Sequence, residues 1–258
     1  MTSQLITDND TLRARYQELA EGDLVLGRVR LKTGEEPLLL DLVERGVDLF
    51  PSALSQLASR SKVLQVRLFG AWMLPRTIAV CDLHDLMAAV NLYHAEGIGR
   101  VVTKHCSRHA GMGIHLWPTI EEVYTQASLE TLPFPFVLQP FCPDARDLRV
   151  VLLGDYQEAY QRSNPYNFRH NLHCGGESTP CSLEEDQLAL CRAVMARGRF
   201  PYAHLDLLVT RNGESFLSEI NLRGGIRGAR ISPGEYQERV EAVHRQHVER
   251  WRGRVAGG

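Results

Sequence analysis

Three oxygen-bearing side chains in the third quarter of the chain have the types and spacing of a cation site. Asp206 lies in the apolar run 203–209, and Glu219 and Asn221 lie two apart in the run 215–221. A short glycine-containing turn separates the runs, which is typical of a β-hairpin. Because side chains alternate along a strand, Glu219 and Asn221 share a face on which Asp206 of the partner strand can meet them. Carboxylates with an amide carbonyl suit Mg²⁺, which takes its other ligands from water and nucleotide phosphates.

Neutralisation of these acids is the reason to expect a cation. Acids buried on paired strands are costly unless a positive charge offsets them, and neither apolar run contains a lysine or arginine. The hairpin therefore predicts the floor of a nucleotide-phosphate site. Taken alone, it is equally consistent with exposed polar residues at the ends of two strands.

Composition sets the class of protein. With 258 residues, 44% hydrophobic and 23% charged, the chain can bury a sizeable core as one large domain or two closely packed lobes. A formal charge of −2 gives no general attraction for nucleic acid or an anionic membrane, and we expect neither as a partner. The first residues lack the features of a secretory signal, and no apolar run reaches the roughly 18 residues of a membrane span, which predicts a cytoplasmic protein. The six scattered cysteines lack zinc-like spacing and are expected to be reduced.

The elements before the hairpin predict how it is completed. Residues 23–50 are expected to form a strand, a helix beginning near Pro37 and a return strand, and residues 54–71 have helical spacing. Asp82 is a predicted N-cap for a helix over 83–94. The remaining elements are predicted as strands over 100–104, 114–117, 136–141, 147–155 and 156–162, and a terminal amphipathic helix over 233–251.

A lysine and a glycine turn lie between the first two of those strands. Lys104 ends a β-branched strand, and Gly111 and Gly113 flank Met112 shortly afterwards. Glycines let backbone N–H groups approach phosphate oxygens, while a lysine supplies a point charge to the same anion. The pattern could close as a lid over ATP. It equally fits an ordinary hairpin turn, and it is neither a Walker A loop nor a Rossmann fingerprint.

The order of these residues and those that follow resembles the RimK-like branch of the ATP-grasp carboxylate-amine ligases over roughly residues 55–230. The most specific parts are Asp147-Leu148-Arg149, the polar run 168–176 with its Gly-Gly end, and Glu219-x-Asn221 after 205–208. The resemblance implies an α+β ATP-grasp fold in which two α+β lobes clasp ATP. It implies a short α/β N-terminal segment (1–60) before an ATP-grasp domain (61–258), with a lid subdomain at about 80–140 and a C-terminal lobe at about 141–258.

The same resemblance implies a reaction and its cofactors. ATP and Mg²⁺, with Mn²⁺ as an alternative ion, would activate a substrate carboxylate as an acyl phosphate, which an amine then attacks. The substrates would be a small-molecule or peptide carboxylate and an amine acceptor. An ATP-grasp kinase or a nucleotide-binding protein without turnover remains as an alternative.

Residue by residue, the resemblance assigns the site as follows. The nucleotide-binding positions are Lys62, Lys104, Gly111, Gly113, Gln139, Phe141, Asp147, Arg169 and Asn171. The metal ligands are Asp206, Glu219 and Asn221, which agrees with the hairpin. Arg149 and Arg169 are the expected catalytic residues, because the developing negative charge needs fixed cations. Arg223 and Arg227, in a glycine-rich loop one strand end from the metal residues, are expected to bind an acidic substrate group.

Several of these residues have structural alternatives. Lys62 also fits a solvated helix lysine, and Asp147 fits a turn residue. Arg149 and Arg169 also fit surface or loop partners of a nearby acid, which would be Asp144, Asp147 or Asp155. His204 either orients a ligand carboxylate or is packed. The terminal helix packs either on the body of the protein or on a second subunit, which would make the chain a homo-oligomer.

Overall fold

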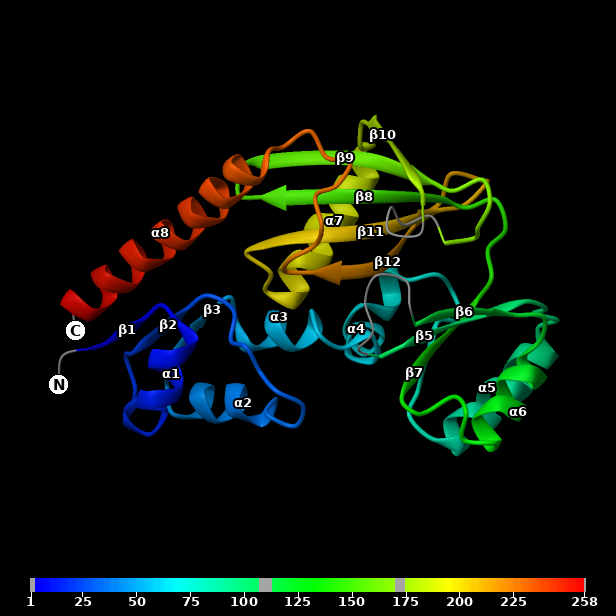
Figure 1. The fold of residues 1–258 in the computed structure, drawn as a ribbon, viewed down its shortest axis with the longest axis horizontal. Helices are drawn as coiled ribbons and strands as arrows, with labels where there is room; N and C mark the ends of the chain where they lie inside the picture. Colours follow the sequence, from blue (N-terminus) through cyan, green and yellow to red (C-terminus); the bar gives the residue numbers. More distant parts are fainter. Residues whose placement is uncertain (1–2, 107–112, 170–174, 258) are drawn as a thin grey trace.

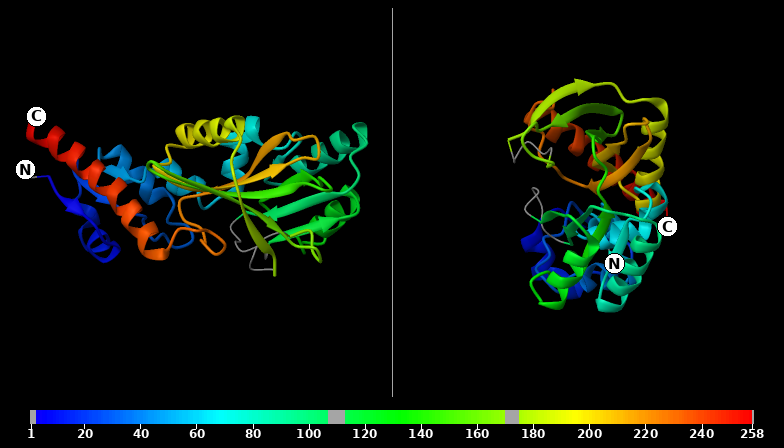
Figure 2. Two further views of the ribbon diagram at one scale, coloured as in Figure 1. Left: turned by 90° about the horizontal axis from the view of Figure 1, so that it is seen from above. Right: turned by 90° about the vertical axis from the view of Figure 1, so that its right-hand side faces the viewer.

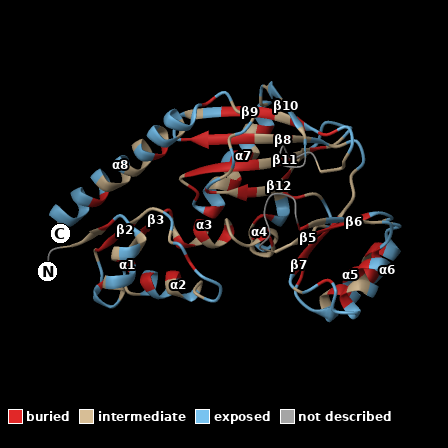
Figure 3. Cartoon of the chain, in the orientation of Figure 1, coloured by how far each residue is buried: buried red, intermediate tan, exposed pale blue. Residues whose placement is uncertain are grey.

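The computed structural model describes residues 3–106, 113–169 and 175–257, and this part of the chain forms three β-sheets with helices packed against them (Figure 1). The buried side chains gather into a separate core beside each sheet (Figure 3). Among the described residues, no helix is long and apolar enough to cross a bilayer.

The N-terminal segment is a three-stranded parallel sheet. Its elements are β1 (Leu5–Ile6), α1 (Asn9–Arg15), the 3₁₀ turn η1 (Tyr16–Glu18), β2 (Leu24–Leu26), α2 (Pro37–Glu44) and β3 (Asp48–Phe50), with the strand order β1-β2-β3. The expected strand, helix and return strand are confirmed, and Pro37 starts α2 as predicted. Helix α1, capped by the Asp8 side chain, was not expected.

Two short helices lead from this segment to the rest of the chain. They are α3 (Ala53–Ala58) and α4 (Lys62–Phe69), followed by η2 (Gly70–Trp72). The helical stretch expected over 54–71 is therefore interrupted, because the Ser61 side chain accepts a bond from Leu64 N and starts a new helix. Gln65 of α4 is buried and bonds both backbone groups of Ile220, at 2.8 and 3.0 Å, which fixes α4 beside the predicted hairpin.

The middle of the chain forms a four-stranded antiparallel sheet with two helices on it. The elements are β4 (Ile78–Val80), α5 (Leu83–Ala95), β5 (Val101–His105), β6 (Ile114–Trp117), α6 (Ile120–Ser128) and β7 (Phe136–Pro140), in the strand order β4-β7-β5-β6. Asp82 caps α5, as predicted, by accepting a bond from Asp85 N at 2.9 Å. Lys104 lies near the end of β5, an inner strand of this sheet.

The largest sheet is antiparallel and has five strands. They are β8 (Arg146–Leu153), β9 (Tyr156–Ser163), β10 (Glu177–Cys181), β11 (Tyr202–Val209) and β12 (Ser215–Asn221), in the order β10-β9-β8-β11-β12. Helix α7 (Glu185–Gly198) packs on this sheet and on α4. Strands β8, β9, β11 and β12 were expected from the sequence, whereas α7 and β10 were not.

Helix α8 (Pro233–Gly257) runs from the large sheet back past the N-terminal sheet (Figures 1 and 2). Trp251 on α8 packs with Leu24 and Phe50 and donates its indole N–H to Gly22 O at 2.9 Å. Of the two positions expected for this helix, the structure therefore shows packing on the body of the same chain.

Candidate active site

One face of the large sheet gathers the charged residues singled out in the sequence. The predicted hairpin is confirmed as β11 and β12, and Asp206 lies directly opposite Glu219 in its register. On the other side of β11, Asp206 lies opposite Arg149 of β8, while Asp147 lies opposite Arg162 of β9. Strand pairing thus brings together residues that are up to 72 positions apart in the chain.

The Asp206 carboxylate is held by two arginines. Its oxygens lie 2.5 Å from Arg149 Nε and 3.1 Å from Arg162 Nη2, and Arg162 also lies 2.5 Å from Asp147 Oδ1. Burial opposes ionisation of Asp206, but the two guanidinium charges outweigh it and place the pKa of this carboxyl below its ordinary value. Contrary to the expectation from the hairpin sequence, a bound cation is therefore not required to neutralise Asp206. The partners come from β8 and β9, which the hairpin sequence does not reveal.

Two lysines approach the other acid of the hairpin. Lys62, only 7% exposed, lies 3.2 Å from Glu219 Oε1, so the alternative of a solvated helix lysine is wrong. Asn221 Nδ2 donates to the same oxygen at 3.1 Å. Lys104 Nζ donates to Ser218 Oγ at 3.1 Å. Burial lowers the pKa of Lys104, the charge of Glu219 opposes this and the nearby Lys62 adds to it, with a net pKa of about 8.

A cavity of about 390 Å³ opens over this face and extends to the four-stranded sheet. Eight predicted residues line it: Lys104, Gln139, Phe141, Asp147, Arg149, Arg169, Asp206 and Glu219. Val102, Ile114 and Leu208 supply apolar walls. We call this the smaller cavity. It combines apolar side chains with lysine, arginine and carboxylate groups.

Arg169 connects the two lobes at the edge of the smaller cavity. Its guanidinium donates to Ile114 O of β6, from Nε at 3.0 Å and also from Nη2. It stacks over Phe168, whose ring meets Phe141 edge-on. Among the described residues, these contacts position Arg169, and not the ion pair with an acid that was the alternative expectation for it.

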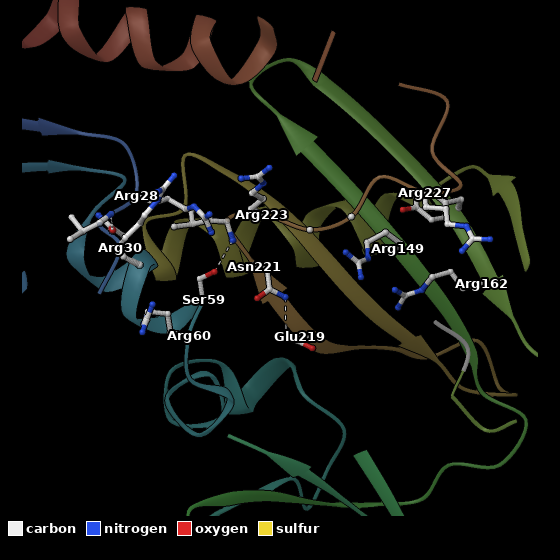
Figure 4. Close-up of a pocket in the computed structure, with 16 residues that line it drawn as sticks. Arg28, Arg30, Ser59, Arg60, Arg149, Arg162, Glu219, Asn221, Arg223 and Arg227 are labelled. Atoms are coloured by element: carbon white, nitrogen blue, oxygen red, sulfur yellow. Dashed lines mark hydrogen bonds between the residues drawn. The ribbon is translucent and has the colours of Figure 1, made fainter. Parts of the chain in front are cut away.

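A cavity of about 760 Å³ adjoins the first (Figure 4). This larger cavity shares Arg149, Arg162 and Glu219 with the smaller one. Its other charged or amide residues are Arg28, Arg30, Gln56, Arg60, Asn221, Arg223 and Arg227. The expected substrate residues Arg223 and Arg227 are thus on its wall. Arg28, Arg30 and Arg60 were not singled out from the sequence.

Some predicted residues lie elsewhere. Lys62 is not among the described residues that line either cavity, and it contacts the site through Glu219. Gly113 is buried, and its carbonyl accepts a bond from His105 N at 2.7 Å, as in a hairpin turn. Gly111 and Asn171 lie outside the described residues. Within the described part of the chain, no group of three or more His, Cys, Asp or Glu is arranged to hold a metal ion.

A glycine that the sequence analysis did not single out supports Arg149. A Cβ on Gly224 would lie 2.5 Å from Arg149 Nη1 and 2.8 Å from His204 Nδ1. His204 is buried, and its Nε2 hydrogen-bonds Tyr236 Oη at 3.0 Å. Burial lowers the pKa of His204 to about 3, so the ring is neutral. Only a residue without a side chain fits between these two groups.

No protein-family model matches the chain, but two curated proteins are similar to it in sequence. The chain is 32% identical over 199 residues to a glutathione synthetase of Parasynechococcus marenigrum (strain WH8102), covering 71% of this chain and 60% of that protein. It is 34% identical over 119 residues to a probable alpha-L-glutamate ligase of Xylella fastidiosa (strain M12), covering 44% and 38%. The chain therefore spans 60% or less of the length of these curated relatives.

Solved structures establish the fold. The crystal structure of a D-cycloserine synthetase superposes with a TM-score of 0.64 at 14% identity, covering 94% of this chain and 99% of that one. An ATP-grasp ligase complexed with a minimal precursor, Mg and ADP superposes with a TM-score of 0.60 at 16% identity, covering 95% and 98%. The α+β ATP-grasp fold expected from the sequence is confirmed, and so is the resemblance of this chain to the RimK-like ATP-grasp ligases.

Proposed function

We propose that this protein is a ligase that uses ATP and Mg²⁺ to activate a carboxylate as an acyl phosphate and couples it to an amine. The observation that carries the proposal is the junction of the two cavities at Arg149, Arg162 and Glu219. A terminal phosphate in the smaller cavity and a carboxylate in the larger one would meet there. Holding both reactants at one point removes much of the entropic barrier. The names of the two curated relatives, a synthetase and a ligase, support it.

The residues of the smaller cavity suit the parts of a nucleotide. Its apolar walls and Phe141 fit a base, and Gln139 at the end of β7 offers an amide to the base edge. Lys104 and Arg169 supply charge to the phosphates, and we place Asn171 and the Gly111–Gly113 turn with them from the resemblance. In this assignment residues 1–60 precede an ATP-grasp domain over 61–258, with the lid at about 80–140 and the remaining lobe at about 141–258.

The donor set of the hairpin fits Mg²⁺, with Mn²⁺ as an alternative. Asp206 and Glu219 face each other across β11 and β12, Asn221 lies beside Glu219, and all three carry the hard oxygen donors that Mg²⁺ takes. When bound, the ion would offset phosphate charge. Arg149 and Arg162 then keep Asp206 ionised, and Lys62 holds the Glu219 carboxylate in place. Arg149 and Arg162, at the junction, stabilise the negative charge that develops on the transferred phosphoryl group and the acyl phosphate.

The test is release of ADP and phosphate by the pure protein with ATP and Mg²⁺, offered a panel of carboxylates with and without amines. We expect turnover only when a carboxylate and an amine are both present, with a condensed product detected by mass spectrometry. Turnover on one substrate alone, with a stable phosphorylated product, would instead indicate a kinase. ATP binding without turnover across the panel would contradict the ligase assignment.

The lowered pKa of Lys104 predicts how ATP affinity depends on pH. Lys104 carries its charge below about pH 8 and loses it above, so in the free protein ATP affinity should be constant from pH 6.5 to 7.5 and decrease from pH 8 to 9.5. Calorimetric titration with MgATP measures this. Lys104→Arg should remove the decrease, because arginine stays protonated. An equally steep decrease in that variant would show that another group is responsible.

A further inference from the structure

The larger cavity carries more positive charge than the proposed chemistry uses. Seven arginines line it, and Glu219 is its one lining carboxylate among the described residues. Arg149 and Arg162 are neutralised by Asp206 and Asp147, and Glu219 is paired with Lys62. The other arginines that line it are Arg28, Arg30, Arg60, Arg223 and Arg227.

These arginines come from two distant parts of the chain. Arg28, Arg30 and Arg60 lie on the N-terminal side of the cavity, and Arg223 follows β12 on the other (Figure 4). Arg60 has an acid, Glu36, at 3.7 Å. No ion pair with an acid is found for Arg28 or Arg223 among the described residues. Partial burial lowers the pKa of Arg28, and the charge of Arg223 lowers it further. The charges of Arg28 and Arg223 repel each other, and an anion bound between them would offset this repulsion.

The backbone around Arg28 is fixed on both sides. Gly27 has φ +102°, a conformation open to glycine, and its N–H donates to Phe50 O at 2.6 Å. Val29 N donates to the buried Gln56 Oε1 at 2.8 Å. The guanidinium of Arg28 is thus carried on an anchored turn that directs it toward the cavity. This differs from a solvated basic loop, in which the backbone would lack such bonds.

We infer that Arg28 and Arg223, with Arg30 and Arg60 on the same wall, bind a second anionic group of the carboxylate substrate. The substrate is then a small polyanion, with one carboxylate at the junction of the cavities and a further carboxylate or phosphate at this second subsite. Guanidinium groups bind both anions through paired hydrogen bonds. The inference rests on the proposed function, and it adds the class of the substrate and the residues that select it.

The experiment compares three probes by calorimetry in the absence of ATP: butyrate, glutarate and 3-phosphoglycerate. These carry one carboxylate, two carboxylates, and a carboxylate with a phosphate. We expect the wild-type protein to bind at least one of the two probes with a second anionic group more than about tenfold tighter than butyrate, because that group adds charge-assisted hydrogen bonds to the guanidinium groups. Preference for 3-phosphoglycerate identifies the second group as a phosphate, and preference for glutarate identifies it as a carboxylate.

The variant Arg28→Gln with Arg223→Gln should abolish that preference. The charge-matched control is Arg192→Gln with Arg197→Gln, two exposed positions on α7 that line neither cavity, and it should bind as the wild type does. Equal binding of all three probes by the wild type, or an unchanged preference in the Arg28/Arg223 variant, would overturn the inference.

The outcome for the subsite is separable from the outcome for the reaction. Binding of glutarate or 3-phosphoglycerate that depends on Arg28 and Arg223 supports the subsite even if no carboxylate stimulates ADP release, in which case the ligase assignment fails alone. Amine-dependent turnover with monocarboxylates that is equal in the wild type and the Arg28/Arg223 variant overturns the subsite and leaves the ligase assignment standing.

Discussion

Replacing Asp206 by Asn is expected to lower the turnover number for ADP release by roughly 10³-fold, the scale seen when a fixed charge-stabilising group is removed from a reacting centre. The change keeps the shape of the side chain and removes the charge that faces Glu219 and holds Arg149 at 2.5 Å. Steady-state turnover measured against Mg²⁺ concentration at saturating ATP should show both a lower maximum and a weaker response to Mg²⁺.

Unfolding must be measured alongside, because Arg149 loses its carboxylate while Arg162 keeps Asp147. We expect the free energy of unfolding in urea to decrease by about 2 kcal/mol, the cost of leaving a charged donor without its partner. Asp155→Asn is the matched control, since that side chain is 95% exposed and pairs with Arg239 at the surface. Turnover and Mg²⁺ response like the wild type in Asp206→Asn would remove Asp206 from the metal assignment.

Gly224→Ala should lower the turnover number by roughly 10²-fold while the protein stays folded. The new methyl group would overlap Arg149 Nη1 at 2.5 Å and the buried ring of His204 at 2.8 Å, and the arginine is the more movable of the two. Displacing its guanidinium from the junction removes charge from the transition state more than from bound ATP, so the turnover number should change more than the Michaelis constant for ATP.

The neighbouring residue provides the control for that substitution. A Cβ on Gly225 would meet nothing within 4 Å, and Gly225 has no positive φ, so Gly225→Ala should retain the activity of the wild type. Equal activity of the two alanine variants would show that the position of Arg149 is not what Gly224 secures. Equal loss in both would indicate that flexibility of the loop, not the contact with Arg149, matters.

The part of the site that the sequence could predict is the part that depends on local alternation. Asp206, Glu219 and Asn221 follow from a single hairpin, and Asp82 from the capping of one helix. Helix α7 was missed although a signal was present: Gln187 accepts from Glu184 N at 3.1 Å, as in a capping box.

The ion pairs and the arginine wall could not be predicted in the same way. The pairing of Arg149 with Asp206 depends on the register between β8 and β11, which are 57 residues apart at this pair. Arg28 and Arg223 line the same cavity only because separate sheets pack around it. Hydrophobic periodicity fixes which face of a strand is buried, but it carries no information on which distant strands become neighbours.

The contact between Trp251 and Gly22 has a consequence for the order in which the two cavities form during synthesis. It joins residues 229 positions apart, and it holds the N-terminal sheet that carries Arg28. The smaller cavity is lined by residues 102–219, so its walls can assemble once the two later sheets are complete. The larger one needs closure of a loop that includes most of the chain, which is the slower kind of folding step. In a newly made chain, the smaller cavity should therefore form before the larger one.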